Sequence, residues 1–186
     1  MTGRLENIIG AFAFRVADAV NAVTQEKLDI AGPTAAAIAL IEHDPGITIE
    51  LLRKGLGLSH PGTVRVVNRL VAGGLVERRP SLQDRRAVEL WLTADGVEAV
   101  LDIFDARRST IATLLGGLSD SERDALEGIV EKLLSTTVND LAHAYAICRL
   151  CESASCADCP VESGLKRRAQ QEQINEEPSY GDDHSC

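Results

Sequence analysis

Apolar residues near the start of the chain recur at the three-and-four spacing of an amphipathic helix, from Leu5 to Val23. Gly32-Pro33 interrupts this pattern, and a proline in the first turn then begins a short second helix that extends to about Glu42. The sequence Asp44-Pro45-Gly46 is typical of a turn and ends it. The pattern therefore predicts two helices before this turn.

Two further helices and a hairpin are predicted next. Thr48 can cap a helix that ends at Gly57, and Ser59 can cap the helix that follows. After Gly73-Gly74, the runs LVERRP and AVELWL read as strands on either side of the polar loop SLQDRR. A helix-turn-helix followed by a β-hairpin is the pattern of a winged helix.

The second half of the chain is predicted to be helical as far as its cysteines. Thr93 can cap a fifth helix, and Ser119 with Glu122 forms a capping box that opens a sixth. The apolar stripe of the sixth helix continues to Cys148, so we expect one long helix. Beyond Gly164 the chain has little apolar content and no periodicity, which predicts a disordered acidic tail.

The predicted fold class is mainly α with a small β-hairpin wing. Only 3% of the residues are aromatic, whereas alanine and leucine are abundant, which favours helices over sheets. We expect five parts: an N-terminal dimerisation helix (1–32), a winged helix-turn-helix (33–92), C-terminal dimerisation helices (93–147), a cysteine cluster (148–163) and the tail (164–186).

Charge is distributed unevenly along the chain. The net charge is -9, yet residues 53–86 carry eight basic and two acidic side chains. From residue 152 to the end there are eight acidic and three basic ones. Because nucleic-acid binding depends on local charge, the acidic total does not exclude a DNA partner.

The chain has no apolar run long enough for a membrane span, and its start lacks the pattern of a secretion signal. We therefore expect a cytoplasmic protein with no membrane partner.

The helix capped by Ser59 is the predicted recognition helix for double-stranded DNA. Arginine can bond guanine and asparagine can bond adenine in the major groove, while hydroxyl groups reach phosphates or base edges. Its predicted contacts are Ser59, His60, Thr63, Arg65, Asn68 and Arg69, and its predicted buried stripe is Val64, Val67, Leu70 and Val71. The alternative is an ordinary surface helix with solvated arginines. Caps, periodicity, local charge and the following hairpin together favour DNA binding.

The run LGLSHPGTVRVVNRLVAGGLVERRPSLQDRRAVELWLTADG, with Asp84 and Arg86 in its wing, resembles the core of the MarR family of bacterial regulators. The resemblance extends to about Arg149. It implies a homodimer with intertwined terminal helices, a fourth helix in the major groove and Arg86 in the minor groove. Asp84 would orient a neighbouring arginine, or only form the turn, and Arg85 would touch phosphate. The family also implies repression as the usual mode, with small aromatic acids or oxidants as effectors.

Dimerisation is also expected from the residues themselves. The apolar stripes of the first and sixth helices are longer than a small winged domain can cover, so a partner chain must bury the rest. A homodimer predicts a pseudo-palindromic operator with half-sites about one helical turn apart.

Four of the five cysteines form the pattern Cys148-x2-Cys151-x4-Cys156-x2-Cys159-Pro160, which departs from the general MarR pattern. Two adjacent thiolate pairs can wrap a soft metal tetrahedrally. Zinc sites commonly have a longer stretch between the pairs, and closely spaced cysteines that end in Cys-Pro are typical of iron–sulfur ligation. Zinc, an iron–sulfur cluster, a metal-free thiol switch and simply reduced cysteines all remain open. Cys186 is not counted as a ligand.

The metal decides what the cysteine cluster would do. Zinc would staple the end of the dimerisation helix, whereas a cluster or a thiol pair would let the protein sense metal or redox state. An enzyme is not expected, because the sequence has no glycine-rich phosphate loop, no βαβ unit around the cysteines and no paired catalytic carboxylates. The alternative to a DNA-binding regulator is a metal-stapled interaction module or redox protein that does not act on DNA.

Overall fold

The computed structural model describes residues 3–28, 32–82, 87–156 and 158–176. Its elements in chain order are α1 (Arg4–Leu28), α2 (Pro33–His43), α3 (Ile49–Leu56), α4 (His60–Ala72), β1 (Val76–Pro80), β2 (Val88–Leu92), α5 (Ala94–Leu114), α6 (Asp120–Thr137), α7 (Leu141–Cys148), the 3-10 helix η1 (Ser153–Ser155) and α8 (Pro160–Glu176). The predicted fold class, mainly helical with a two-stranded hairpin, is confirmed. None of the described helices combines the length and the apolar character that crossing a membrane requires.

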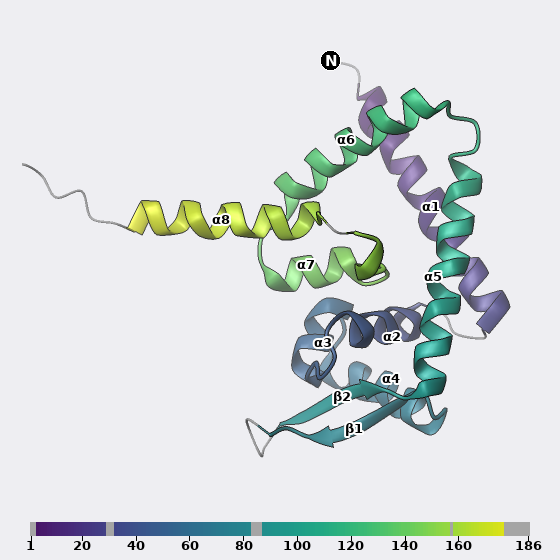
Figure 1. Ribbon diagram of the computed structural model, residues 1–186, viewed down its shortest axis with the longest axis vertical. Helices are drawn as coiled ribbons and strands as arrows, with labels where there is room; N and C mark the ends of the chain where they lie inside the picture. Colours follow the sequence, from purple (N-terminus) through teal and green to yellow (C-terminus); the bar gives the residue numbers. More distant parts are fainter. Residues whose placement is uncertain (1–2, 29–31, 83–86, 157, 177–186) are drawn as a thin grey trace, which may run out of the picture.

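The winged helix forms one end of the molecule (Figure 1). It comprises α2, α3, α4 and the antiparallel hairpin, whose register pairs Val76 with Leu92 and Pro80 with Val88. The long helix α5 leaves the hairpin and packs against α1, while α7 lies on α3 and α8 packs against α6. The helix α7 thus connects the winged helix to the C-terminal end of the chain.

Local caps set most of the helix boundaries as predicted. The side chains of Thr48, Ser59 and Thr93 each accept a hydrogen bond from a backbone N–H in the first turn of the following helix. The capping box of Ser119 and Glu122 is also present. Gly57 ends α3 in the left-handed conformation, with φ 64°, which a residue without a Cβ adopts at little cost.

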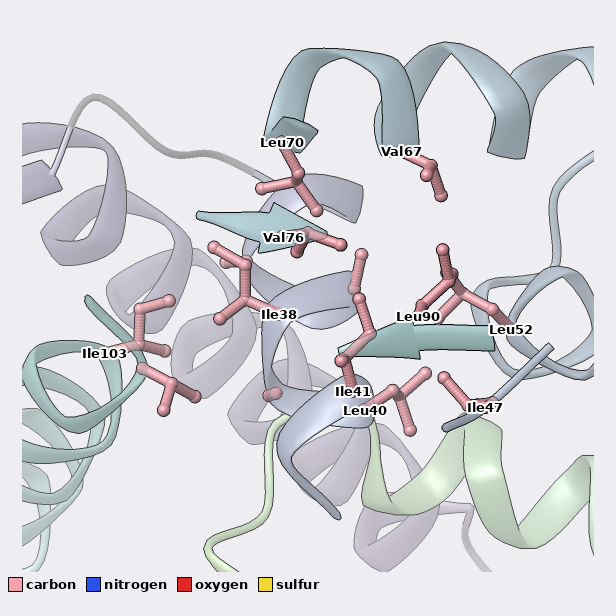
Figure 2. Close-up of a cluster of buried hydrophobic side chains, with 14 of the residues drawn as sticks. Ile38, Leu40, Ile41, Ile47, Leu52, Val67, Leu70, Val76, Leu90 and Ile103 are labelled. Atoms are coloured by element: carbon pink, nitrogen blue, oxygen red, sulfur yellow. The ribbon is translucent and has the colours of Figure 1, made fainter. Parts of the chain in front are cut away.

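The core of the winged helix surrounds α2. This helix is buried from Thr34 to Ile41, so no face of it is polar. Figure 2 shows Val67 and Leu70 of α4 and Leu90 of β2 directed toward the α2 side chains. Burial of these aliphatic side chains holds α3 and α4 in a fixed mutual orientation.

The prediction of one long sixth helix up to Cys148 is wrong. The helix α6 ends at Thr137, and α7 begins at Leu141. Val138 has an extended backbone and is buried, so this apolar residue anchors the turn between the two helices. Asp140 then caps α7 by accepting a hydrogen bond from the His143 N–H at 2.8 Å.

The prediction of a disordered tail from residue 164 is wrong up to Glu176, because α8 extends to that residue. Good helix formers fill most of this segment, and Lys166 pairs with Glu162 one turn away at 2.6 Å. Tertiary packing adds to this, since Arg167 donates a hydrogen bond to the carbonyl of Ser135. The rest of the predicted tail, residues 177–186, lies outside the described residues.

Candidate nucleic-acid interface

The helix α4 presents a polar face to solvent. His60, Arg65, Asn68 and Arg69 are exposed there. Ser59 is exposed as well and caps the helix, because its Oγ accepts from the Gly62 N–H at 3.3 Å. These five predicted contacts therefore share an accessible surface.

Thr63 is a correction to the predicted interface, because it is completely buried. Its hydroxyl donates to the Ser59 carbonyl at 3.2 Å, within the same helix. Thr63, Val67 and Leu70 are all buried, at the i, i+4 and i+7 positions of one face. In the predicted stripe Val67 and Leu70 are confirmed as buried, whereas Val64 and Val71 are only half-buried.

Arg78 of β1 belongs to the same surface, although the sequence did not indicate it. Its Nη2 donates to Oδ1 of Asn68 at 2.7 Å, which joins the hairpin to the polar face of α4. The next residue, Arg79, pairs with Glu77 and stacks over the ring of Trp91 at 4.7 Å. The sequence did predict a hairpin directly after α4. Only the structure shows that Arg78, and not Arg79, contacts Asn68 of the helix.

The predicted wing contacts Asp84, Arg85 and Arg86 lie outside the described residues. The strands that lead into and out of this loop are described, and both belong to the hairpin beside α4. The described part of the interface is therefore α4 with the adjoining strand.

The four clustered cysteines lie together at the junction of α7 and α8. They line one mostly apolar cavity of about 310 Å³, together with His43 and Tyr145. Cys148 is buried, Cys151 and Cys159 are half-buried and Cys156 is exposed, and all four are free thiols. The structure thus brings together the residues that the sequence singled out.

Neighbouring cysteines shift one another's pKa. A hydrogen bond between Cys148 and Cys151 raises the pKa of Cys148 and lowers the pKa of Cys151, so the Cys148 S–H donates. The charges of Arg107 and His43 also lower the pKa of Cys151. In the second pair, burial and the neighbouring Cys159, to which it is hydrogen-bonded, raise the pKa of Cys156.

These thiols do not yet form a coordination site. Among the described residues, no group of three or more histidine, cysteine, aspartate or glutamate side chains is arranged to hold a metal ion. The predicted ligand set is therefore gathered in one place without the geometry of a metal centre.

The cysteine-bearing helix α7 is in direct contact with the winged helix. The hydroxyl of Tyr145 donates to Oδ2 of Asp44 at 2.6 Å. Burial, followed by this hydrogen bond, raises the pKa of Tyr145 above its ordinary value. A Cβ on Gly55 of α3 would lie 2.9 Å from Cβ of Tyr145, so the two helices pack as closely as a glycine allows. No sequence pattern indicated the hydrogen bond between Tyr145 and Asp44, which lie 101 positions apart.

Comparison with known proteins relates this winged helix to a family. Residues 28–87 match the MarR family. The transcriptional repressor MprA of Escherichia coli K12 is 38% identical over 80 residues, which cover 43% of this chain and 46% of that protein. The chain thus matches about half the length of this curated relative.

Solved structures agree on the fold. The apo form of wild-type MarR from E. coli is 26% identical, with a TM-score of 0.60, and the match covers 72% of this chain and 97% of that one. A mutant of MepR from S. aureus, solved bound to an oligodeoxyribonucleotide, is 20% identical with a TM-score of 0.53, over 70% of this chain and 96% of that one. A further relative, from Thauera aromatica, is named as a putative transcriptional regulatory protein for the hcr operon. The cysteine segment lies outside the family match.

Proposed function

We propose that this chain, whose residues 28–87 match the MarR family, is a transcriptional regulator that binds operator DNA as a homodimer and represses transcription from the cytoplasm. The polar face of α4 carries the proposal. Arg65, Asn68 and Arg69 are exposed on a helix whose other face is fixed in a closely packed core. Arginine and asparagine are the side chains that most often read guanine and adenine in the major groove.

The hairpin supports the same proposal. The hydrogen bond from Arg78 to Asn68 joins the hairpin to the recognition helix. Two such units in a dimer would reach successive grooves of a pseudo-palindromic site. Arg86, Arg85 and Asp84 would supply the minor-groove and phosphate contacts of the wing.

Exposed apolar side chains support the homodimer. On α1, Leu5 and Phe14 are 66% and 73% exposed, and Ile129 and Leu133 of α6 are 58% and 50% exposed. Apolar surface of this extent on two long helices is typical of a subunit interface. The substitution Ile9→Glu on α1 is expected to halve the mass measured by light scattering, whereas Val88→Glu on the hairpin leaves it unchanged. A monomeric parent protein would refute the dimer.

An open cavity beside these helices supports a small-molecule effector. It has a volume of about 990 Å³, and its lining includes Phe12, Val16 and Ile111. Arg107 and Arg149 are the charged side chains in this apolar lining. An aromatic carboxylate suits such a site, because apolar walls with one or two cationic groups bind and orient an organic anion. A panel of aromatic acids should raise the melting temperature of the parent and not of Arg107→Ala.

Binding to the promoter of the protein's own operon tests the proposed function. Fluorescence anisotropy should give an affinity that falls steeply with salt, because lysine and arginine release counterions from the phosphates. A scrambled duplex should bind far more weakly, and Arg86→Ala should weaken operator binding. Equal affinity for both duplexes at every salt concentration would contradict sequence-specific regulation.

A further inference from the structure

The cysteine segment is a concentrated set of sulfur donors that the winged helix does not use. All four sulfurs come from a span of twelve residues, 148–159, and face one cavity between α7 and the start of α8. Along the chain they form two Cys-x2-Cys pairs, Cys148 with Cys151 and Cys156 with Cys159. Pairs of this kind are what a thiolate metal centre requires.

We propose that Cys148, Cys151, Cys156 and Cys159 bind a metal centre as two thiolate pairs. A single tetrahedral ion and a two-iron cluster both accept cysteines in pairs, and both use soft sulfur ligands. On binding a single divalent ion, four metal–sulfur bonds form and each thiol that is still protonated releases its proton to solvent, so that no oxidant or reductant is needed. An iron–sulfur cluster would in addition need iron and inorganic sulfide. The site has no counterpart in the family match, which ends at residue 87.

The exposure of the four cysteines distinguishes metal ligands from cysteines that only fill a core. A cysteine that only fills a core is buried, and Cys148 alone meets that description. Cys156 is exposed, yet it lines the same cavity as the buried Cys148. Core packing does not explain an exposed cysteine at that position, whereas a role as a metal ligand does.

A metal centre requires the two pairs to approach each other. Among the described residues, no three such donors are arranged to hold an ion, so the sulfurs must move before they can share one. Cys156 follows the three-residue helix η1, whereas Cys148 is fixed in the last turn of α7. A shared ion would fasten the start of α8 to the end of α7.

The small core around the site explains why a bound metal would stabilise this end of the chain. The buried residues that hold α8 to α6 and α7 are Val138, Ala144, Cys148 and Val161. A core of this size gives little stability by itself. Small protein units with little core are commonly stabilised by a structural metal.

Metal analysis of the full chain, purified anaerobically, tests the proposal. We expect one zinc ion per chain, or iron and acid-labile sulfide with visible absorption, and either result supports the thiolate centre and identifies it. For a zinc protein, Co²⁺ added to the metal-free chain should produce the visible and near-ultraviolet bands of tetrathiolate cobalt, and Zn²⁺ should abolish them. Cys148→Ser and Cys156→Ser should each lose the bound metal, whereas Cys186→Ser keeps it.

Two outcomes would overturn the proposal. One is a reduced chain that contains no metal and gives no cobalt–thiolate bands. The other is a Cys156→Ser variant that folds by circular dichroism and retains the metal as well as Cys186→Ser does. Because Cys156 is exposed, its substitution tests the site even if Cys148→Ser fails to fold. The readout needs no DNA, so it is independent of the proposed function.

Discussion

The winged helix and the α7–α8 end differ in what holds them together. In the described part of the chain, the core of the winged helix contains fifteen buried apolar residues from six helices and strands or their flanking loops, whereas the core at the α7–α8 end contains four. Hydrophobic burial stabilises a fold roughly in proportion to the apolar area removed from water. The winged helix is therefore stable through packing, and the α7–α8 end depends on close single contacts and, in our proposal, on a metal.

The largest expected effect comes from the core of the winged helix. Leu52 of α3 is fully buried, and Leu52→Ala should lower the free energy of unfolding by about 2–5 kcal/mol, because it removes methyl groups and leaves a cavity. Leu82, which is fully exposed, provides the control, and Leu82→Ala should change stability by less than about 0.5 kcal/mol. Equal effects in urea denaturation would show that α3 does not depend on this core.

A smaller and local effect is expected at the crossing of α8 and α6. A Cβ on Gly164 would lie 2.4 Å from the Ser135 carbonyl oxygen and 2.6 Å from a methyl group of Val138. Gly164→Ala should therefore loosen α8 by roughly 1–3 kcal/mol, as overpacking does. Hydrogen exchange should accelerate in α8 and stay unchanged in α4.

The matched control is Gly128→Ala in α6. A Cβ there meets no other atom within 4 Å, so alanine should stabilise α6 by about 0.5–1 kcal/mol. If Gly164→Ala behaved like Gly128→Ala, the close crossing of α8 and α6 would be wrong.

The smallest effect is expected at the contact between the two regions. Tyr145→Phe removes the hydrogen bond to Asp44 and should cost about 1 kcal/mol. A double-mutant cycle with Asp44→Asn isolates this pair, because each single substitution also changes other interactions. A coupling energy near zero would mean that α7 is not joined to the winged helix through Tyr145.

The sequence predicted the elements that local signals define. Thr48, Ser59, Thr93 and the capping box at Ser119 act within one helical turn, so their positions were readable without a structure. The end of α6 was missed although Asp140 is a good capping residue, because Leu141, Ala144 and Tyr145 continue the apolar stripe beyond it. Val138 is buried in one cluster with residues of α7 and α8, which the spacing along one helix does not reveal.

The sequence predicted most of the exposed residues of the candidate interface, but not how they contact one another. Exposed Arg65 and Asn68 were expected, but Thr63 depends on the exact phase of α4, which the core determines. The bond between Arg78 and Asn68 depends on how the hairpin lies beside α4. The spacing of the four cysteines was enough to predict that they lie together. The contact of their helix α7 with the winged helix, through Tyr145 and Asp44, was visible only in the tertiary fold.

The most direct test of the central claim, that α4 recognises DNA, compares two arginine substitutions that change the net charge equally. Arg65 lies on the exposed face of α4, and Arg123 is exposed on α6, far along the chain from the winged helix. Anisotropy titration of the operator should show that Arg65→Ala weakens binding by about 5- to 150-fold, the range expected for one lost base contact of 1–3 kcal/mol. Arg123→Ala should bind within twofold of the parent. Equal affinities of the two variants would contradict recognition by α4.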